Sequence, residues 1–275
     1  MLGKLFKYEF KNTAKVMLTI YGVLLAVTAL GMLVFSFDPI RNGESIAASI
    51  ILVSYILLYV LSILALYIVT YVYLTIHFHK TMYSVQGYLT HTLPVKPLTT
   101  FHVKLATALV WMITCTLLMI LSIVGFISAI RGPEFWHDLS SINIDALNQE
   151  LLSELGMPLS EFIFMIIFFL FVNALASLLI VYASSSIGQL FNQHKIVASV
   201  IAGIIFYFAQ QIVALIVSIA VMVGMINDME ATAVSISVST GYNGMIGYSI
   251  GISFLFIIVY YIICNIVVRK KINLE

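Results

Sequence analysis

The chain has 275 residues, of which 62% are hydrophobic and 9% are charged, and its formal net charge is +1. A soluble globular domain carries about 25% charged residues, so this composition excludes a protein that covers its whole surface with water-facing side chains. The hydrophobic residues gather in six long runs without Asp, Glu, Lys, Arg or His, which predicts an all-α membrane protein with six transmembrane helices.

The six predicted spans each exceed the roughly 20 residues that a helix needs to cross a hydrocarbon core of about 30 Å. They cover residues 16–37, 46–76, 105–130, 162–187, 196–226 and 245–268. With the segments that connect them, they predict a single transmembrane domain over residues 1–275.

An amphipathic segment precedes the first span. Its four lysines repeat at helical spacing and form one narrow stripe: Lys4, Lys7, Lys11 and Lys15. Leucine and phenylalanine side chains occupy the opposite face, together with Glu9, a lone carboxylate that requires a partner there. We therefore expect residues 1–15 to form an interfacial elbow helix in the headgroup layer, which either orients the first span or also contacts a partner protein.

A compact polar segment, residues 80–104, separates the second and third spans and reads KTMYSVQGYLTHTLPVKPLTTFHVK. The end of the second span, YVYLTIHFHK, indicates that its helix continues into the membrane interface, where tyrosine is enriched. An ordinary loop that only turns the chain would need no such composition, and the alternative is a docking segment for a partner.

The largest external segment, residues 131–161, contains a second amphipathic pattern. Apolar residues recur at helical spacing within it: Ile144, Leu147, Leu151, Leu152 and Leu155. Gly156 and Pro158 follow as a helix stop signal. The pattern predicts an external helix that lies on the outer membrane surface or caps the bundle, and packing against span ends competes with a gating role.

Neutral amides are the main polar groups within the spans. Asn173, Gln210 and Gln211 fall near mid-span, where an amide must find a hydrogen-bond partner. They either hold neighbouring helices together or line a pathway for an amphipathic substrate. The sequence leaves both interpretations open.

The charges predict the orientation. An even number of spans places both termini on one side, and that side holds eleven of the thirteen Lys and Arg residues, against Arg41 and Arg131 on the other. Ten of the twelve acidic residues fall on that second side. Because cytoplasmic loops carry an excess of Lys and Arg, we expect both termini to be cytoplasmic.

The chain lacks the residues that several kinds of activity require. The chain has no G-x-x-x-x-G-K-[ST] phosphate loop, so it cannot hydrolyse ATP by that route, and it has no H-E-x-x-H motif or clustered metal ligands. Ion-coupled carriers usually bury ionisable residues, which these spans lack. We expect no enzyme activity, no catalytic residue, no metal, no cofactor in this chain and no nucleic-acid partner.

The sequence of the loop between the second and third spans resembles that of a known family. KTMYSVQGYLTHTLPVKPLTTFHVKLATALVW, residues 80–111, resembles the first cytoplasmic loop of ATP-binding-cassette (ABC) transporter permeases of the type-2 exporter family, above all the small bacterial six-span subunits that open with a basic segment like MLGKLFKYEFK. The shared features are the GYL-x-x-TLPV stretch at 87–95 and Lys104 at the entry to the third span. The family often has an acidic residue where this chain has Ser84, Val85 and Gln86.

The resemblance implies a cytoplasmic coupling loop over 80–104 that docks on a separate nucleotide-binding subunit. Its short helix would cover 80–91 and end at Leu93-Pro94, because the residue before a proline avoids helical angles. Pro97 would start the next helix, which runs through Lys104. The implied partner contacts are these loop residues: Tyr83, Gln86, Gly87, Tyr88, Leu89 and His91.

The function that follows from the resemblance is the transmembrane subunit of an ATP-driven exporter in the bacterial plasma membrane. ATP and Mg would be bound by partner ATPase subunits, and a second permease copy or a related permease would complete the pathway among membrane lipids. The alternative is a non-transporting binding or immunity protein that acts through a partner in the bilayer.

Overall fold

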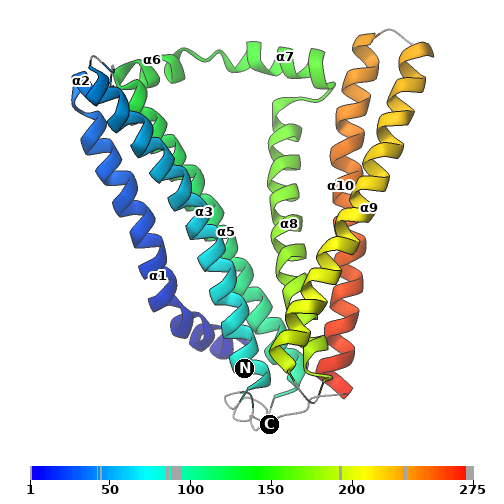
Figure 1. Cartoon of the computed structure of the whole chain (residues 1–275). Coiled ribbons are helices and arrows are strands. Elements are labelled where there is room, and N and C mark those ends of the chain that lie inside the picture. Colours follow the sequence, from blue (N-terminus) through cyan, green and yellow to red (C-terminus); the bar gives the residue numbers. More distant parts are fainter. Residues whose placement is uncertain are drawn as a thin grey trace. The chain divides into compact units, whose positions relative to one another are not determined.

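The structure, a computed structural model of the chain (Figure 1), describes residues 2–41, 43, 45–84, 87, 95–191, 194–231 and 234–270. Side chains are described over the same ranges except at 40, 225–231, 234–245 and 270. Regular secondary structure in these ranges is helical and no strand occurs among them, which confirms the predicted all-α class.

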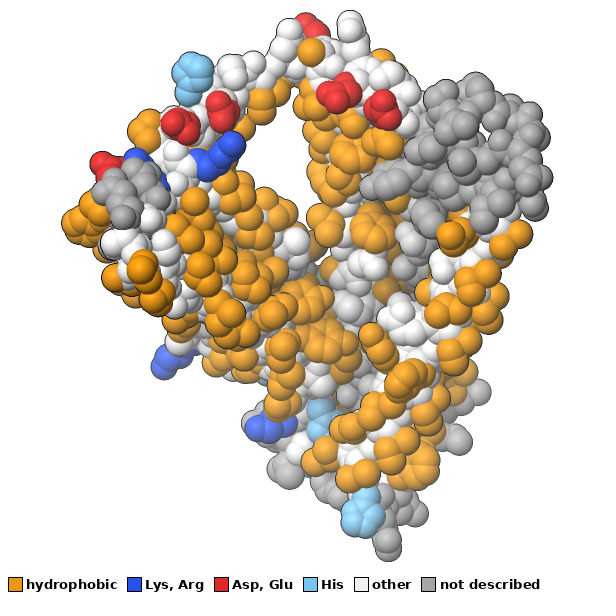
Figure 2. Space-filling view, turned by 45° about the horizontal axis from the view of Figure 1, so that its top comes forward, with side chains coloured by type: hydrophobic (Ala, Val, Ile, Leu, Met, Phe, Trp, Pro, Cys, Tyr) orange, Lys and Arg blue, Asp and Glu red, His pale blue; other side chains and the backbone are white. Residues whose placement is uncertain are grey.

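Six long helices follow one another along the chain. They are α1 (Leu2–Phe35), α3 (Ile46–Tyr83), α5 (Pro97–Arg131), α8 (Leu159–Gly188), α9 (Lys195–Ala231) and α10 (Val234–Lys270). Each is long and apolar enough to cross a membrane, and Figure 2 shows hydrophobic side chains over much of the visible surface. Within the described ranges, the six predicted apolar segments are helical, and these helices indicate a multi-pass membrane protein.

The helices run beyond the apolar spans that predict them. α3 continues to Tyr83, and α5 begins at Pro97, as predicted, well before the third apolar run. The expected elbow over 1–15 is not a separate helix, because α1 is continuous from Leu2 to Phe35. A hydropathy run stops at the first ionisable residue, whereas lysine is a good helix former and histidine a tolerated one, so the helix does not stop there.

By its internal contacts the chain divides into two compact units, and the single transmembrane domain over residues 1–275 stays a prediction. The first comprises Met1–His77 and His102–Ile142, and the second comprises Phe78–Phe101 and Asn143–Glu275. α3 and α5 therefore each contribute residues to both units, and each unit has its own packing.

Hydrogen-bonded hydroxyls and aromatic rings hold the first unit together. Phe35, Tyr59 and Phe126 form a buried cluster from α1, α3 and α5. Beside it, the Ser122 hydroxyl oxygen lies 2.7 Å from both the Thr28 and the Tyr59 hydroxyl oxygens. These polar groups satisfy one another, so they can lie within an apolar bundle at little cost.

In the second unit, α8, α9 and α10 pack against one another (Figure 1). The start of α9 lies close against Gly188 of α8, where an added Cβ would lie 2.7 Å from the Lys195 carbonyl oxygen. The end of α3 joins this unit, since the Phe78 ring stacks on Tyr182 with ring centroids 3.7 Å apart.

Three short helices complete the described chain: α2 (Asp38–Arg41), α6 (Pro133–Ser141) and α7 (Ile144–Leu155). α7 covers the residues for which an amphipathic helix was expected, and its external position stays a prediction. The Asn143 side chain accepts hydrogen bonds from the first N–H groups of α7, and Gly156 ends the helix in a left-handed conformation with φ 69°. α6 was not predicted, although Pro133 at its first turn is a recognisable start signal.

Candidate functional site

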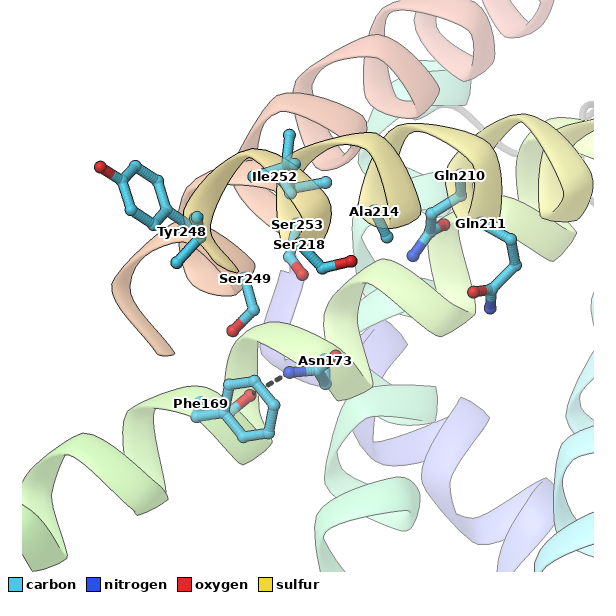
Figure 3. A pocket seen from close by; sticks show the side chains of 12 residues that line it. Phe169, Asn173, Gln210, Gln211, Ala214, Ser218, Tyr248, Ser249, Ile252 and Ser253 are labelled. Carbon is cyan, nitrogen blue, oxygen red and sulfur yellow. Dashed lines mark hydrogen bonds between the residues drawn. The ribbon is translucent and has the colours of Figure 1, made fainter. Parts of the chain in front are cut away.

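A cavity of about 330 Å³ lies between α8, α9 and α10 of the second unit (Figure 3). Its polar lining consists of amides and hydroxyls: Asn173, Gln210, Gln211, Ser218, Tyr248, Ser249 and Ser253. Apolar side chains fill the remaining wall: Phe169, Ala214, Val217, Val221 and Ile252. Among the described lining residues none is Asp, Glu, Lys, Arg or His, so the cavity is polar without being charged.

The structure brings together the three amides that the sequence singles out. Asn173 comes from the middle of α8, and Gln210 and Gln211 come from α9 (Figure 3). Their position beside one cavity is compatible with the pathway hypothesis. Whether a substrate passes them stays a prediction.

Two of the lining residues can be placed along the length of their helices. Gln210 is fifteen residues beyond Lys195, which is about 22 Å along the helix. On α10, Ser253 is sixteen residues before Arg269, or about 24 Å. Both distances are shorter than a hydrocarbon core of about 30 Å, so a membrane-spanning α9 and α10 would hold Gln210 and Ser253 within it.

Some of the lining groups are satisfied within their own helices. The Asn173 side-chain N–H donates to the Phe169 carbonyl at 2.9 Å (Figure 3). The hydroxyls of Ser218 and Ser249 each donate to a backbone carbonyl one turn earlier, at 2.8 Å. Since these protons are engaged, the two serine oxygens remain in the cavity wall as hydrogen-bond acceptors.

The two glutamines differ from these groups. Gln210 is half-buried and Gln211 is exposed, and neither forms a hydrogen bond with another part of the chain that the structure describes. An amide in an apolar environment without a partner costs about 2–7 kcal/mol. Both side chains therefore require water, a ligand or another chain at this depth.

Ser218 on α9 and the hydroxyls of α10 are the cavity residues that the sequence does not single out. Ser249 and Ser253 lie one turn apart on α10, so they share one helix face. That spacing is a weak signal, because a hydroxyl in a transmembrane helix usually bonds to its own backbone.

A second polar feature lies in the first unit, where Glu9 finds the partner that its apolar surroundings require. The Lys104 ammonium donates to the Glu9 carboxylate at 2.9 Å, and His77 Nε2 lies 2.8 Å from the same oxygen. We call these three residues the Glu9 cluster. Their side chains are 16% exposed at Glu9, 15% at His77 and 4% at Lys104.

The charge state of Glu9 follows from these contacts. Burial by itself would raise the pKa of the carboxyl, but the hydrogen bond with His77 and the charge and hydrogen bond of Lys104 outweigh it. They lower the pKa of Glu9 to about 2. Glu9 is therefore ionised at neutral pH, and a negative charge is held between α1, α3 and α5.

Aromatic contacts next to the Glu9 cluster fix the first turns of α1. Phe10 stacks on Trp111 with ring centroids 4.5 Å apart, and the Trp111 indole N–H donates to the Thr13 hydroxyl at 2.8 Å. The lysines of the predicted stripe are all exposed: Lys4, Lys7, Lys11 and Lys15. On the opposite face Phe10 is packed whereas Leu2 is 58% exposed, and the place of the segment in the headgroup layer stays a prediction.

The expected coupling loop is described only in part. Gln86, Tyr88, Leu89 and His91 lie outside the described residues. Gly87 is buried, and its N–H donates to the Ser84 carbonyl at 2.7 Å.

Tyr83, the remaining predicted partner contact, is 3% exposed. Its hydroxyl lies 2.7 Å from the Ser186 hydroxyl, and its ring packs edge-on against Phe78. These contacts anchor the end of α3 inside the second unit. A direct contact between Tyr83 and a partner would require this packing to open.

Comparison with known proteins adds no relative: no family model matches the chain, and no curated protein and no solved structure matches it.

Proposed function

We propose that the chain is the transmembrane subunit of an ATP-driven exporter of the ABC type-2 class, in the bacterial plasma membrane. Separate ATPase subunits would bind ATP and Mg, and a second permease copy or a related permease would complete the pathway. The cavity between α8, α9 and α10 is the observation that carries this proposal.

An amide without a hydrogen-bond partner is costly within a membrane. A protein that only anchors or scaffolds gains nothing from Gln210 and Gln211 at membrane depth without an internal partner. A transport protein does gain, because a hydrated or ligand-filled cavity is where polar groups at this depth are useful. The described lining has no acid, base or histidine to bind a driving proton, which favours an energy source outside this chain.

The cytoplasmic loop supplies the link to that energy source. Its resemblance to type-2 permeases favours docking on an ATPase, and two continuous helices, α3 and α5, lead from the loop into the spans. A displacement of the loop would therefore be transmitted along rigid helices. In this mechanism, ATP binding moves the loop and changes access to the cavity.

A second candidate is a non-transporting protein that binds a partner within the bilayer. The observation that favours it is the exposure of Gln211, because a polar side chain of a partner could cover this amide as well as a ligand could. The two candidates differ in whether an ATPase is associated with the chain.

Co-purification tests the proposal. The full chain, tagged and expressed with its neighbouring genes, should bring down an ATPase with a Walker motif, and the complex should hydrolyse ATP. The double substitution Tyr88→Asp, Leu89→Asp should release the ATPase while the chain keeps its elution profile, whereas Lys96→Ala should retain it. Recovery of the chain without any ATPase would remove the exporter proposal and leave the binding protein.

A further inference from the structure

We infer that the cavity between α8, α9 and α10 binds the neutral part of an amphiphile that both donates and accepts hydrogen bonds, such as a secondary amide, and that it rejects charged groups. This inference names the substrate class of the site described above, and its place in export rests on the proposed function. Binding itself can be tested separately.

The cavity wall presents both hydrogen-bond donors and hydrogen-bond acceptors. Gln210 and Gln211 each carry two N–H donors and one carbonyl acceptor, and no described residue pairs with them. Ser218 and Ser249 have given their protons to backbone carbonyls, so they offer acceptor oxygens. The wall thus presents donors and acceptors together, and a ligand amide matches it with one N–H and one carbonyl.

The absence of charge gives the second part. No described lining residue can neutralise an ammonium or a phosphate. At the centre of a bilayer an uncompensated charge is disfavoured by about a hundredfold or more. The cavity therefore selects against charged groups without needing any repulsive side chain.

The volume of the cavity and the exposure of its lining limit the ligand further. A volume of about 330 Å³ lies at the low end of small-molecule pockets, which span about 300–1,000 Å³. It suits a compact polar group with a short apolar flank against Phe169 and Ile252. Gln211, Ser218 and Tyr248 are exposed, so a ligand can reach the cavity without separating the helices.

Photolabelling of the full chain in phosphatidylcholine nanodiscs tests the inference. Three probes share one diazirine-bearing alkyl chain and end in an N-methyl amide, a methyl ester or a trimethylammonium group. Labelling of cavity residues is divided by labelling of lipid-facing residues to correct for partitioning. We expect the amide to exceed the ester by about tenfold, the value of one hydrogen bond, and to exceed the ammonium by about a hundredfold.

Substitutions locate the effect. The double variant Gln210→Leu, Gln211→Leu should reduce amide labelling about tenfold or more and bring it to the level of the ester. Ile216→Leu, on the same helix and 59% exposed outside the cavity, should change nothing. Ser218→Ala removes one acceptor with little risk to folding, so it should lower amide labelling even if the double variant fails to assemble.

Three results would overturn the inference: equal normalised labelling by all probes, amide labelling that survives the glutamine and serine substitutions, or cross-linking of Gln211→Cys between two chains without cavity labelling. The last result would assign the glutamines to a protein interface. Loss of labelling selectivity with the ATPase still bound rejects only the ligand class. Selective labelling with no associated ATPase keeps the site and rejects export.

Discussion

Replacing Glu9 with alanine should destabilise the first unit far more than replacing an exposed residue of the N-terminal segment. The substitution leaves Lys104, whose side chain is 4% exposed, without its carboxylate. It also removes one hydrogen-bond contact of His77. The lysine is too buried for water to replace Glu9 at low cost.

The magnitude follows from two independent arguments. The pKa of Glu9 falls from its ordinary value of 4.5 to about 2. Since each pKa unit corresponds to about 1.4 kcal/mol, this net shift, which already includes the opposing effect of burial, corresponds to about 3.5 kcal/mol. Removing one partner of a buried ion pair costs about 3–5 kcal/mol, and the partial exposure of Glu9 favours the low end. We expect Glu9→Ala to lower the free energy of unfolding by about 3 kcal/mol.

Reversible unfolding of the full chain in mixed detergent micelles measures this loss. Lys11→Ala is the matched control, because Lys11 lies on the same helix and is exposed, and its effect should stay within about 0.5 kcal/mol. The double variant Glu9→Ala, Lys104→Met should recover much of the stability, since no uncompensated charge remains. The reasoning is refuted if Glu9→Ala equals its control or if the double variant is the less stable of the two.

Three other outcomes follow from the structure. Glu9 has a lowered pKa, so its stabilisation is present above pH 4.5 and is lost as the pH falls through about 2; acid unfolding of the native chain should show this loss, and Glu9→Gln should lack it. Ser122→Ala removes the hydroxyl that joins Thr28 and Tyr59 and should cost about 1 kcal/mol in the same unfolding assay, with a smaller cost if Tyr59 finds another partner. Gly188→Ala places a Cβ 2.7 Å from a backbone oxygen and should cost about 1–3 kcal/mol, whereas Gly224→Ala, with open space around it, should be neutral in thermal stability.

The sequence predicts the parts of this protein that depend on local composition. Six apolar runs give six helices in their correct places, because the requirement to satisfy every backbone group within the membrane forces each run to be helical. The stop signal at Gly156 gives the end of α7 for a similar reason, since its left-handed conformation is local. Helix ends beyond the apolar runs are missed, because ionisable residues end a hydropathy run but not a helix.

Contacts between distant residues are what the sequence cannot supply. The need of Glu9 for a partner is visible in the pattern of residues 1–15, but nothing in it selects His77 and Lys104, which lie on two other helices. The sequence links Lys104 only to the resemblance of the loop, at the entry to the third span. Likewise, the sequence indicates Tyr83 as a contact for a partner. In the structure its side chain is buried and its hydroxyl lies beside that of Ser186.

The hydrogen-bond accounting also separates two kinds of intramembrane polar residue that look alike in sequence. Thr28, Tyr59 and Ser122 satisfy one another, so their polarity is explained by helix packing. Gln210 and Gln211 have no such partner among the described residues, so packing within this chain does not explain them.

Two further polar side chains also lack a hydrogen-bond partner in the part of the chain that the structure describes. Both side-chain amide atoms of Gln189 and the side-chain oxygen of Asn265 are buried without a partner in the described ranges. Gln189 directly follows the end of α8, and Asn265 lies four residues before Arg269, so both are near the ends of their helices rather than near mid-span. Membrane depth and an open cavity are what distinguish the two glutamines from them, and for that reason the cavity, rather than every unsatisfied amide, is assigned to ligand binding.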